Sequence, residues 1–275
     1  FHIGGMETWI YRLASRLRDR YDLTFVATEV EEITPRFHAL GEAIYVRHDW
    51  LRLVRLLRRK RIQVVQYGNV RLYADCALAA GVPVVVERTD GLRSGVALRS
   101  KRGLDAVVAS TRSTIEPIAR LIPRKKIHLI YNGIDLAELD TTPPDRLDFG
   151  PEHIVIGRVS RFGAGKNLGL LIDAVRALAR RYPQVRLVLV GDNSRIPGAP
   201  DEMSLLRERA RGLEEFIRFT GHVEQPEALI RGFDIGVCVS RPNNEGIPNS
   251  LLESMAARQP VVATEVDDIQ ELLEA

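Results

Sequence analysis

Two positively charged residues flank a glycine-containing loop in the second half of the chain. Arg161 and Lys166 lie five positions apart, directly after an apolar run that is typical of a strand. Across such a loop both side chains can reach one diphosphate, and two fixed cations can stabilise a leaving group without a metal. The loop is not a Walker A motif, because its spacing differs and no Ser or Thr follows Lys166. The alternative is a pair of solvated surface cations.

A second segment carries two glutamates, Glu245 and Glu253. Pro248 keeps Glu245 on a loop, and a helix begins at Asn249 or Ser250. Carboxylates accept hydrogen bonds from sugar and ribose hydroxyls, and a helix N-terminus attracts phosphate. Ser250 and Glu253 also have the spacing of a capping box, so Glu253 has a purely structural alternative: it could only cap the helix.

Two glycine motifs belong to the first half of the chain. Gly4 and Gly5 directly precede a helical pattern, where glycine lets the backbone approach an anion closely. The alternative is a simple strand-to-helix turn. Asn132-Gly133 follows the last apolar run of this half and is a turn signal.

These motifs must be positioned by the elements around them. Short apolar runs predict strands, and apolar residues at helical spacing predict helices. The predicted strands are 23–27, 43–46, 62–66, 82–86, 104–109, 127–131, 154–157, 185–190, 217–220, 235–239 and 260–264. The predicted helices are 7–20, 49–61, 71–80, one opening at 113, 168–181, 202–213 and 250–257. The alternation predicts parallel β-α-β units in doubly wound sheets, whose ligands bind at the carboxyl ends of the strands.

The alternation is interrupted at residues 136–152, which contain prolines and a glycine that cannot continue a helix or a central strand. We interpret this segment as an interdomain linker. The sequence therefore predicts an N-terminal domain over residues 1–149, a C-terminal domain over residues 150–275, and a ligand cleft between them.

Composition excludes several classes of protein. Of the 275 residues, 45% are hydrophobic and 27% charged, which is typical of a globular chain and not of a disordered one. Cys76 and Cys238 form neither a disulfide framework nor a metal cluster, which favours a reducing compartment such as the cytoplasm. The histidines do not cluster, so no metal site is predicted. Aromatic and basic residues do not interleave, and a net charge of +3 gives no reason to expect nucleic-acid binding.

One helix is strongly basic. Residues 52–61 hold six cations, and an inward side is supplied by Leu51, Leu53, Val54, Leu56 and Leu57. The simplest interpretation is a solvated helix face. The alternative is peripheral contact with anionic lipid at the inner face of a membrane, or with a lipid-linked acceptor.

Taken together, the motifs resemble the retaining glycosyltransferases of family 4 (glycosyltransferase group 1). The resemblance extends over nearly the whole chain and rests on the segments Gly4 to Glu7, Asn132 to Asp135, Arg161 to Asn167, Val190 to Asp192 and Glu245 to Ala256. It implies the α/β GT-B fold, in which two Rossmann-like, doubly wound parallel-sheet domains face each other across a cleft. Relative to this family the first strand and the last elements are missing, so we expect a chain truncated at both ends.

The resemblance also implies roles for the motif residues. The donor would be a UDP- or GDP-linked sugar, held mainly by the C-terminal domain without a metal or other cofactor. Arg161 and Lys166 would neutralise its diphosphate, Glu253 would accept hydrogen bonds from the ribose, and Glu245 would contact the sugar. Gly4 and Gly5 would approach the phosphate from the N-terminal domain. The donor site would be lined by the backbone of Gly246, Ile247, Pro248, Asn249, Ser250 and Leu251. The acceptor would be a glycan, a lipid-linked sugar or a small molecule.

The chain departs from the family pattern at several positions. Many relatives carry histidines where this chain has Asp90 and Gln66-Tyr67. The carboxylate of Asp90 can accept a hydrogen bond from a sugar hydroxyl, which makes it a candidate catalytic residue; alternatively, it is a turn residue before Gly91. Asp267-Asp268 stands where relatives often have two glycines, and nothing in the sequence explains this change.

Two other functions remain open at this point. A nucleotide-sugar 2-epimerase shares the two-domain fold, but it would need acid and base groups near the sugar C2, and no such set is recognisable. A catalytically silent member would bind a nucleotide sugar without turning it over. The presence of Arg161, Lys166, Glu245 and Glu253 together argues for the enzyme.

Overall fold

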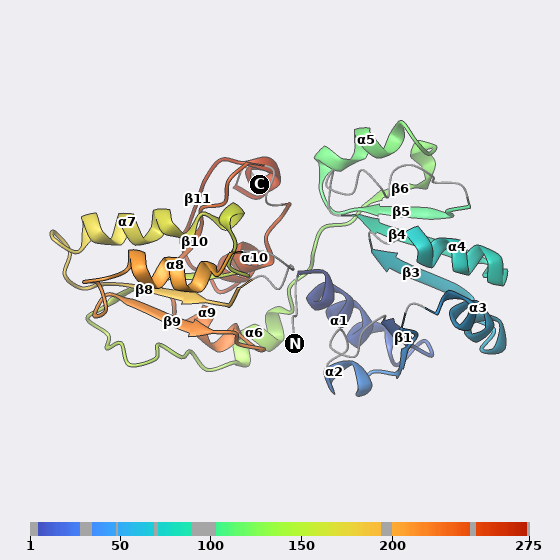
Figure 1. The fold of residues 1–275 in the computed structure, drawn as a ribbon, viewed down its shortest axis with the longest axis horizontal. Helices are drawn as coiled ribbons and strands as arrows, with labels where there is room; N and C mark the ends of the chain where they lie inside the picture. The colour runs from blue at the N-terminus through green and yellow to red at the C-terminus, as the bar shows by residue number, and fades with distance from the viewer. Residues whose placement is uncertain are drawn as a thin grey trace. The chain divides into compact units, whose positions relative to one another are not determined.

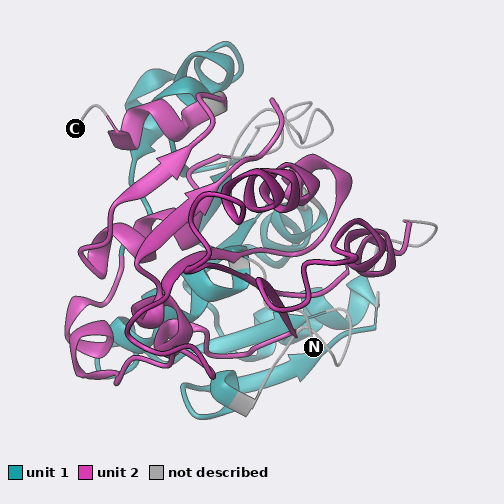
Figure 2. Cartoon of the chain, turned by 90° about the vertical axis from the view of Figure 1, so that its left-hand side faces the viewer, with its two compact units in different colours: residues 1–133 teal, residues 134–275 magenta. Residues whose placement is uncertain are grey.

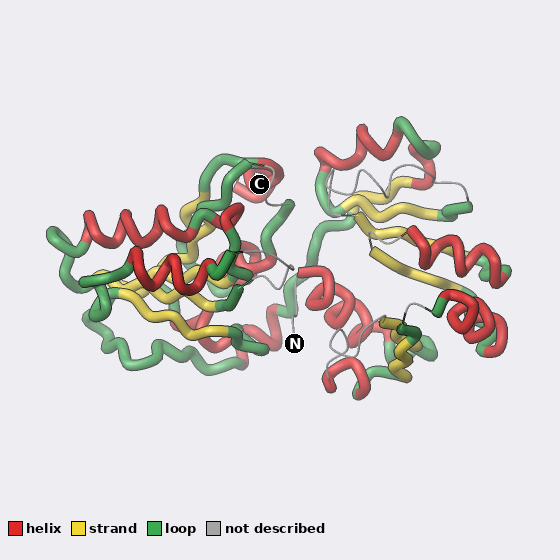
Figure 3. Tube along the Cα trace, viewed as in Figure 1, coloured by secondary structure: helices red, strands yellow, loops and turns green. Residues whose placement is uncertain are grey.

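The computed structural model describes residues 5–27, 35–47, 49–68, 71–89, 103–193, 200–242 and 246–273. The chain divides into two compact units, residues 1–133 and residues 134–275 (Figure 2). Both units are built from parallel strands and helices, as the alternation predicts (Figure 3). Three candidate residues, Gly4, Asp90 and Glu245, lie outside the described residues.

The first unit contains two parallel sheets (Figure 1). One pairs β1 with β2, and the other has the strand order β3-β4-β5-β6. The strands are β1 (Thr24–Ala27), β2 (Glu42–Tyr45), β3 (Val64–Gly68), β4 (Val84–Thr89), β5 (Ala106–Ala109) and β6 (Ile127–Leu129). The helices are α1 (Gly5–Leu17), α2 (Pro35–His38), α3 (Trp50–Arg59), α4 (Arg71–Ala80) and α5 (Ile115–Ala119).

Helix α3 shows how the sequence pattern fixes the core of this unit. Leu53, Leu56 and Leu57 are buried, and they pack in one cluster with Val85 of β4 and Val107 of β5. Their spacing places them on one side of the helix, so the arginines between them are left on the exposed side. The predicted inward side of this basic helix is confirmed for these three leucines, whereas Leu51, expected on the same side, is 69% exposed because it lies on the other side of the helix.

The second unit contains one five-stranded parallel sheet with the order β11-β10-β7-β8-β9. Its strands are β7 (Ile154–Val159), β8 (Val185–Val190), β9 (Ile217–Gly221), β10 (Ile235–Cys238) and β11 (Val261–Ala263). Its helices are α6 (Leu136–Thr141), α7 (Leu168–Leu178), α8 (Glu202–Arg209), α9 (Glu227–Gly232), α10 (Asn249–Ala256) and α11 (Gln270–Leu273).

Strand β8 shows that this sheet is covered on both faces. Leu187 and Leu189 pack in the cluster that contains the buried residues of α7 and α8. Val188 and Val190 point the other way and pack with Leu229 of α9. Because alternate residues of a strand face opposite sides, a fully apolar strand of this kind requires helices on both faces.

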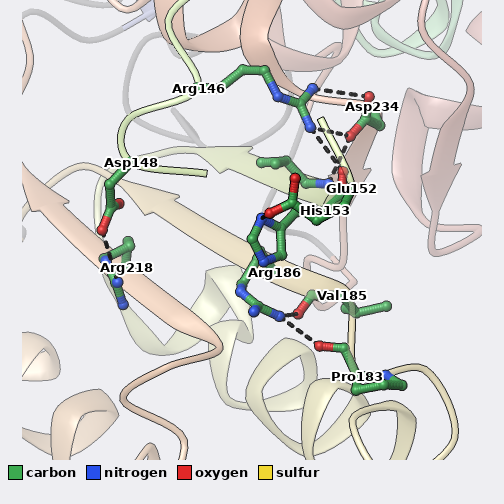
Figure 4. Close-up of polar contacts among 10 residues, drawn as sticks. Arg146, Asp148, Glu152, His153, Pro183, Val185, Arg186, Arg218 and Asp234 are labelled. Atoms are coloured by element: carbon green, nitrogen blue, oxygen red, sulfur yellow. Dashed lines mark hydrogen bonds and ion pairs between the residues drawn. The ribbon is translucent and has the colours of Figure 1, made fainter. Parts of the chain in front are cut away.

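The segment between the two predicted domains belongs to the second unit, which begins at Ile134 and not after residue 149. Arg231 of α9 donates to backbone carbonyls at the end of α6, including that of Leu139 at 3.1 Å. Farther along, Arg146 forms a bidentate ion pair with Asp234 (Figure 4). The second unit therefore includes residues 136–152, the segment interpreted as an interdomain linker. The prolines end α6, but side chains of the second unit hold the segment in place.

Within the part of the chain that the structure describes, no helix is long and apolar enough to cross a membrane.

Candidate functional site

Three loops meet at the carboxyl edge of the sheet in the second unit. The chain leaving β7 is tied to the turn after β8, because the N–H of Phe162 donates to the carbonyl of Asp192 at 2.7 Å. The same loop is tied to the chain leaving β10, because the N–H of Arg241 donates to the carbonyl of Gly165 at 2.9 Å. Strands β7 and β10 are neighbours in the sheet, so segments about 80 residues apart in sequence are brought into contact here.

The loop that carries the two cations is anchored by an aromatic residue. Phe162 is 1% exposed and belongs to the core cluster under α7, whereas Arg161 before it is exposed. Lys166 is half-buried at the end of a 3-10 turn, with its N–H donating to the carbonyl of Gly163 at 2.8 Å. Burial of Phe162 thus fixes the loop from which the predicted pair of cations projects.

The structure explains why the Val-Gly-Asp motif has a glycine at position 191. A Cβ at this position would stand 1.8 Å from the carbonyl oxygen of Ser160, and the residue has a φ of +136°. Only glycine tolerates both conditions. Gly191 therefore allows the turn after β8 to lie directly against the chain that leads to the cation loop.

Helix α10 begins next to these loops. Asn249 is its first residue, as predicted, and Pro248 precedes it without a side-chain hydrogen bond to the helix. Ile247 and Pro248 are buried, and Leu251 is 1% exposed, so the start of the helix is packed firmly against the unit. A helix N-terminus carries a partial positive charge, which favours an anion.

The structure separates the two interpretations of Glu253. A capping box requires Ser250 just before the helix, but Ser250 is the second residue of α10. Its Oγ instead accepts a hydrogen bond from Nη1 of Arg158 at 3.1 Å. The capping-box alternative is therefore wrong, and Glu253 lies one turn inside the helix with its side chain buried (6% exposed for the residue).

Arg158 is a residue that the sequence analysis did not single out. It lies in β7, is 2% exposed, and reaches Val237, Ser240 and Ser250 at the carboxyl edge. The available signal was one arginine inside an otherwise apolar strand.

The candidate residues of the first unit lie in a different setting. Gly5 is the first residue of α1 and is exposed. At the carboxyl ends of β3 and β4, the hydroxyl of Tyr67 donates to the buried carboxylate of Glu87 at 2.8 Å. Beside it, Arg88 donates to Asn132 Oδ1 at 2.6 Å and stacks over the ring of Trp9. The chain at Asn132, where the sequence predicts a turn, has no regular secondary structure and is held by this side-chain hydrogen bond. The predicted approach of Gly5 to a ligand of the second unit stays a prediction.

Among the described residues, no group of three or more His, Cys, Asp or Glu side chains could hold a metal ion. The segments that meet at this edge of the sheet carry two cations, a helix start and a buried carboxylate. This set suits a ligand that carries both phosphate and hydroxyl groups.

Comparison with known families gives two matches. The family model described as Glycosyltransferase Family 4 matches residues 3–138. The model described as Glycosyl transferases group 1 matches residues 151–275.

Curated relatives match part of the chain. Mannosylfructose-phosphate synthase of Agrobacterium fabrum is 31% identical over 175 residues, which are 59% of this chain and 38% of that protein. Phosphatidyl-myo-inositol mannosyltransferase of Mycobacterium leprae is 31% identical over 150 residues, which are 52% of this chain and 37% of that protein. The matched part spans about two fifths of the length of these relatives.

Solved structures match over nearly the whole chain. Anabaena Alr3699/HepE in complex with UDP and glucose has a TM-score of 0.79 at 22% identity, covering 99% of this chain and 80% of that one. WaaG, a glycosyltransferase involved in lipopolysaccharide biosynthesis, has a TM-score of 0.71 at 16% identity, covering 100% of this chain and 81% of that one. At these identities the likeness shows a common GT-B fold.

Proposed function

Because this chain belongs to the family 4 glycosyltransferases, we propose that it transfers a sugar from a nucleotide-sugar donor to an acceptor with retention of anomeric configuration. The donor is UDP- or GDP-linked, and the acceptor is a glycan, a lipid-linked sugar or a small molecule. The observation that carries the proposal is the hydrogen bond from Arg241 to Gly165, which holds the cation loop against the segment leading to α10. HepE is a structural neighbour with UDP bound, which supports a nucleoside diphosphate as the ligand.

The chemistry follows from the charges at the site. Transfer breaks the bond between the sugar C1 and the diphosphate oxygen, so negative charge grows on the leaving diphosphate while the sugar becomes oxocarbenium-like. Arg161 and Lys166 would stabilise that charge, and the start of α10 would add its partial positive charge. Two side-chain cations remove the need for a metal ion in this role. Glu253 would accept hydrogen bonds from the ribose hydroxyls, and Glu245 and Asp90 would contact the sugars.

A panel of UDP- and GDP-linked sugars tests this proposal. The purified protein should release the nucleoside diphosphate and, with an acceptor present, form a glycoside whose anomeric configuration matches the donor by NMR. Activity should persist in EDTA. Conversion of the donor to its C2 epimer without release of nucleotide would identify an epimerase. Binding of the nucleotide with no turnover across acceptor mixtures would identify a silent binding protein.

We also propose that the exposed side of α3 contacts anionic lipid. Support comes from the arrangement of charges: Arg52, Arg55, Arg58 and Arg59 of α3 and Arg61 just after it are all exposed, and Leu51 beside them is 69% exposed. Co-sedimentation with phosphatidylglycerol vesicles should exceed that with phosphatidylcholine vesicles and should fall in an Arg55→Glu/Arg59→Glu variant. Equal sedimentation with both vesicle types would leave α3 as a solvated face.

A further inference from the structure

Arg158 is the largest fully buried side chain in the described part of the molecule. It lies in β7, the middle strand of the five-stranded sheet, among valines and isoleucines. A guanidinium stays charged at every physiological pH, and burying it costs several kcal/mol unless hydrogen bonds and charges compensate. An apolar side chain would be compatible with this buried strand position, so packing alone does not explain the arginine.

The hydrogen bonds of Arg158 join three parts of the candidate site. Nη1 donates to the Oγ of Ser250 in the first turn of α10 at 3.1 Å. The same nitrogen lies 3.5 Å from the carbonyl oxygen of Val237 at the end of β10. Nη2 donates to the Oγ of Ser240, just after that strand, at 3.4 Å. The planar fork thereby ties the start of α10 to the strand that leads to it.

The connection continues to the cation loop. Ser240 is followed by Arg241, whose N–H donates to the carbonyl of Gly165 at 2.9 Å. Gly165 directly precedes Lys166. Arg158 therefore contacts both the start of α10 and the segment that is hydrogen-bonded to the loop of Lys166.

We propose that Arg158 is a positioning residue for the donor diphosphate, an inference that rests on the proposed function. It fixes the first turn of α10 through Ser250, and it places a permanent positive charge beneath the helix start that receives the phosphates. A helix N-terminus and a lysine bind an anion well only when both are aimed at the same point, and small misplacements are costly. Lysine would keep the charge but could not hold Ser240 and Ser250 from two separate nitrogens.

A double-mutant cycle on nucleotide binding tests the inference. The proteins are the wild type, Arg158→Met, Ser250→Ala and the double variant, and the measurement is the Kd of UDP, or of GDP if the wild type binds only GDP, by calorimetry. Ser250→Ala should weaken binding about 3- to 10-fold, the effect of one hydrogen bond. Arg158→Met should weaken it about 10- to 100-fold. In the Arg158→Met background, Ser250→Ala should cost nothing further, because the bond it removes is already absent.

Matched controls separate positioning from folding. Arg218→Met removes another strand arginine, one that pairs with Asp148 at 3.1 Å on the opposite edge of the sheet, and should leave the Kd unchanged. Arg158→Lys should bind the nucleotide more tightly than Arg158→Met, because lysine restores the positive charge but not the forked guanidinium. If Arg158→Met fails to fold, Arg158→Lys takes its place in the cycle. Ser250→Ala is expected to fold, because alanine is compatible with a helix.

Three outcomes would contradict the inference that Arg158 positions the diphosphate site. A lower Tm for Arg158→Met with unchanged Kd would make Arg158 a purely structural residue. Independent, additive effects of Arg158→Met and Ser250→Ala would show that the arginine does not act through α10. Wild-type protein that binds neither UDP nor GDP would contradict the proposed function itself, and this inference with it.

Discussion

Two arginines at opposite edges of the same sheet show different uses of one residue type. Arg146 lies at the amino-terminal edge of the second unit, where it pairs with the carboxylate of Asp234 through two hydrogen bonds of 3.1 and 3.0 Å (Figure 4). It also donates to the carbonyls of Gly232 and His153. Arg158, in contrast, holds hydroxyls of Ser240 and Ser250 at the carboxyl edge. The first arrangement fastens the chain to its sheet, and the second one shapes the surface where a ligand is expected.

The difference follows from the direction of parallel strands. All strands of this sheet end at one edge, where loops and helix starts gather and partial positive charges are exposed. At the other edge the chain enters the strands, and an ion pair there affects only folding. Changes at the carboxyl edge should therefore alter catalysis and binding, whereas changes at the amino edge should alter stability alone.

The largest effect is expected from Lys166 at the carboxyl edge. Lys166→Ala should lower kcat of sugar transfer about 10²- to 10³-fold, because the charge on the leaving diphosphate loses one fixed stabiliser. This change in kcat is measured by steady-state kinetics with the donor of the panel that gives the highest turnover. Lys125→Ala, which removes an exposed lysine of the first unit, is the control and should retain the wild-type rate. Wild-type turnover by Lys166→Ala would remove this lysine from the mechanism.

A smaller effect is expected from Glu253. Its buried carboxylate is proposed to accept hydrogen bonds from the ribose, and a hydrogen bond to a charged group contributes about 1.5–3 kcal/mol. Glu253→Ala should therefore raise the Kd of the nucleoside diphosphate about 10- to 100-fold in calorimetry. Glu253→Gln keeps the shape of the side chain and should lose less. A fall in Tm without a change in Kd would assign this residue to folding.

At the amino edge, Asp234→Ala should change stability and leave binding intact. It leaves the guanidinium of Arg146 without its carboxylate partner in a partly buried setting, which should lower the free energy of unfolding by about 1–3 kcal/mol in urea. Asp148→Ala, which removes a more exposed partner of Arg218, should have little effect. A change in nucleotide Kd for Asp234→Ala would break the contrast between the two edges.

The smallest effect concerns acid stability. Burial raises the pKa of Asp234, but hydrogen bonds from Arg146 and from the N–H of Val155 outweigh burial and hold that pKa below its ordinary value of 3.8. The group therefore contributes stability above its unfolded pKa, and this contribution is lost as the pH falls through the folded pKa. Urea titrations at decreasing pH should show a shallower loss of stability below about pH 4 in Asp234→Asn than in the wild type. Parallel curves would mean that the carboxyl group is not perturbed.

Local patterns determined most of the elements. Strand β8 and helix α4 have the bounds that hydrophobic periodicity predicts, because the period of apolar residues reflects the geometry of one strand or one helix. The short helix α6 escaped notice, although its signal was present: Asp135 accepts a hydrogen bond from the N–H of Glu138 as an N-cap. The two prolines after this helix indicated a break in the chain and gave no information about what the segment packs against.

The sequence by itself identified the candidates for the chemistry: Arg161 and Lys166 through their spacing, and Glu253 in a helix that begins at Asn249 or Ser250. Only the tertiary structure decided that these segments meet, because β7 lies beside β10 although two strands separate them in the chain. It also decided that Glu253 is not a cap and that Arg158 is buried beneath α10. The physical reason is range: capping and periodicity depend on residues a few positions apart, whereas strand order and burial depend on how the whole unit packs.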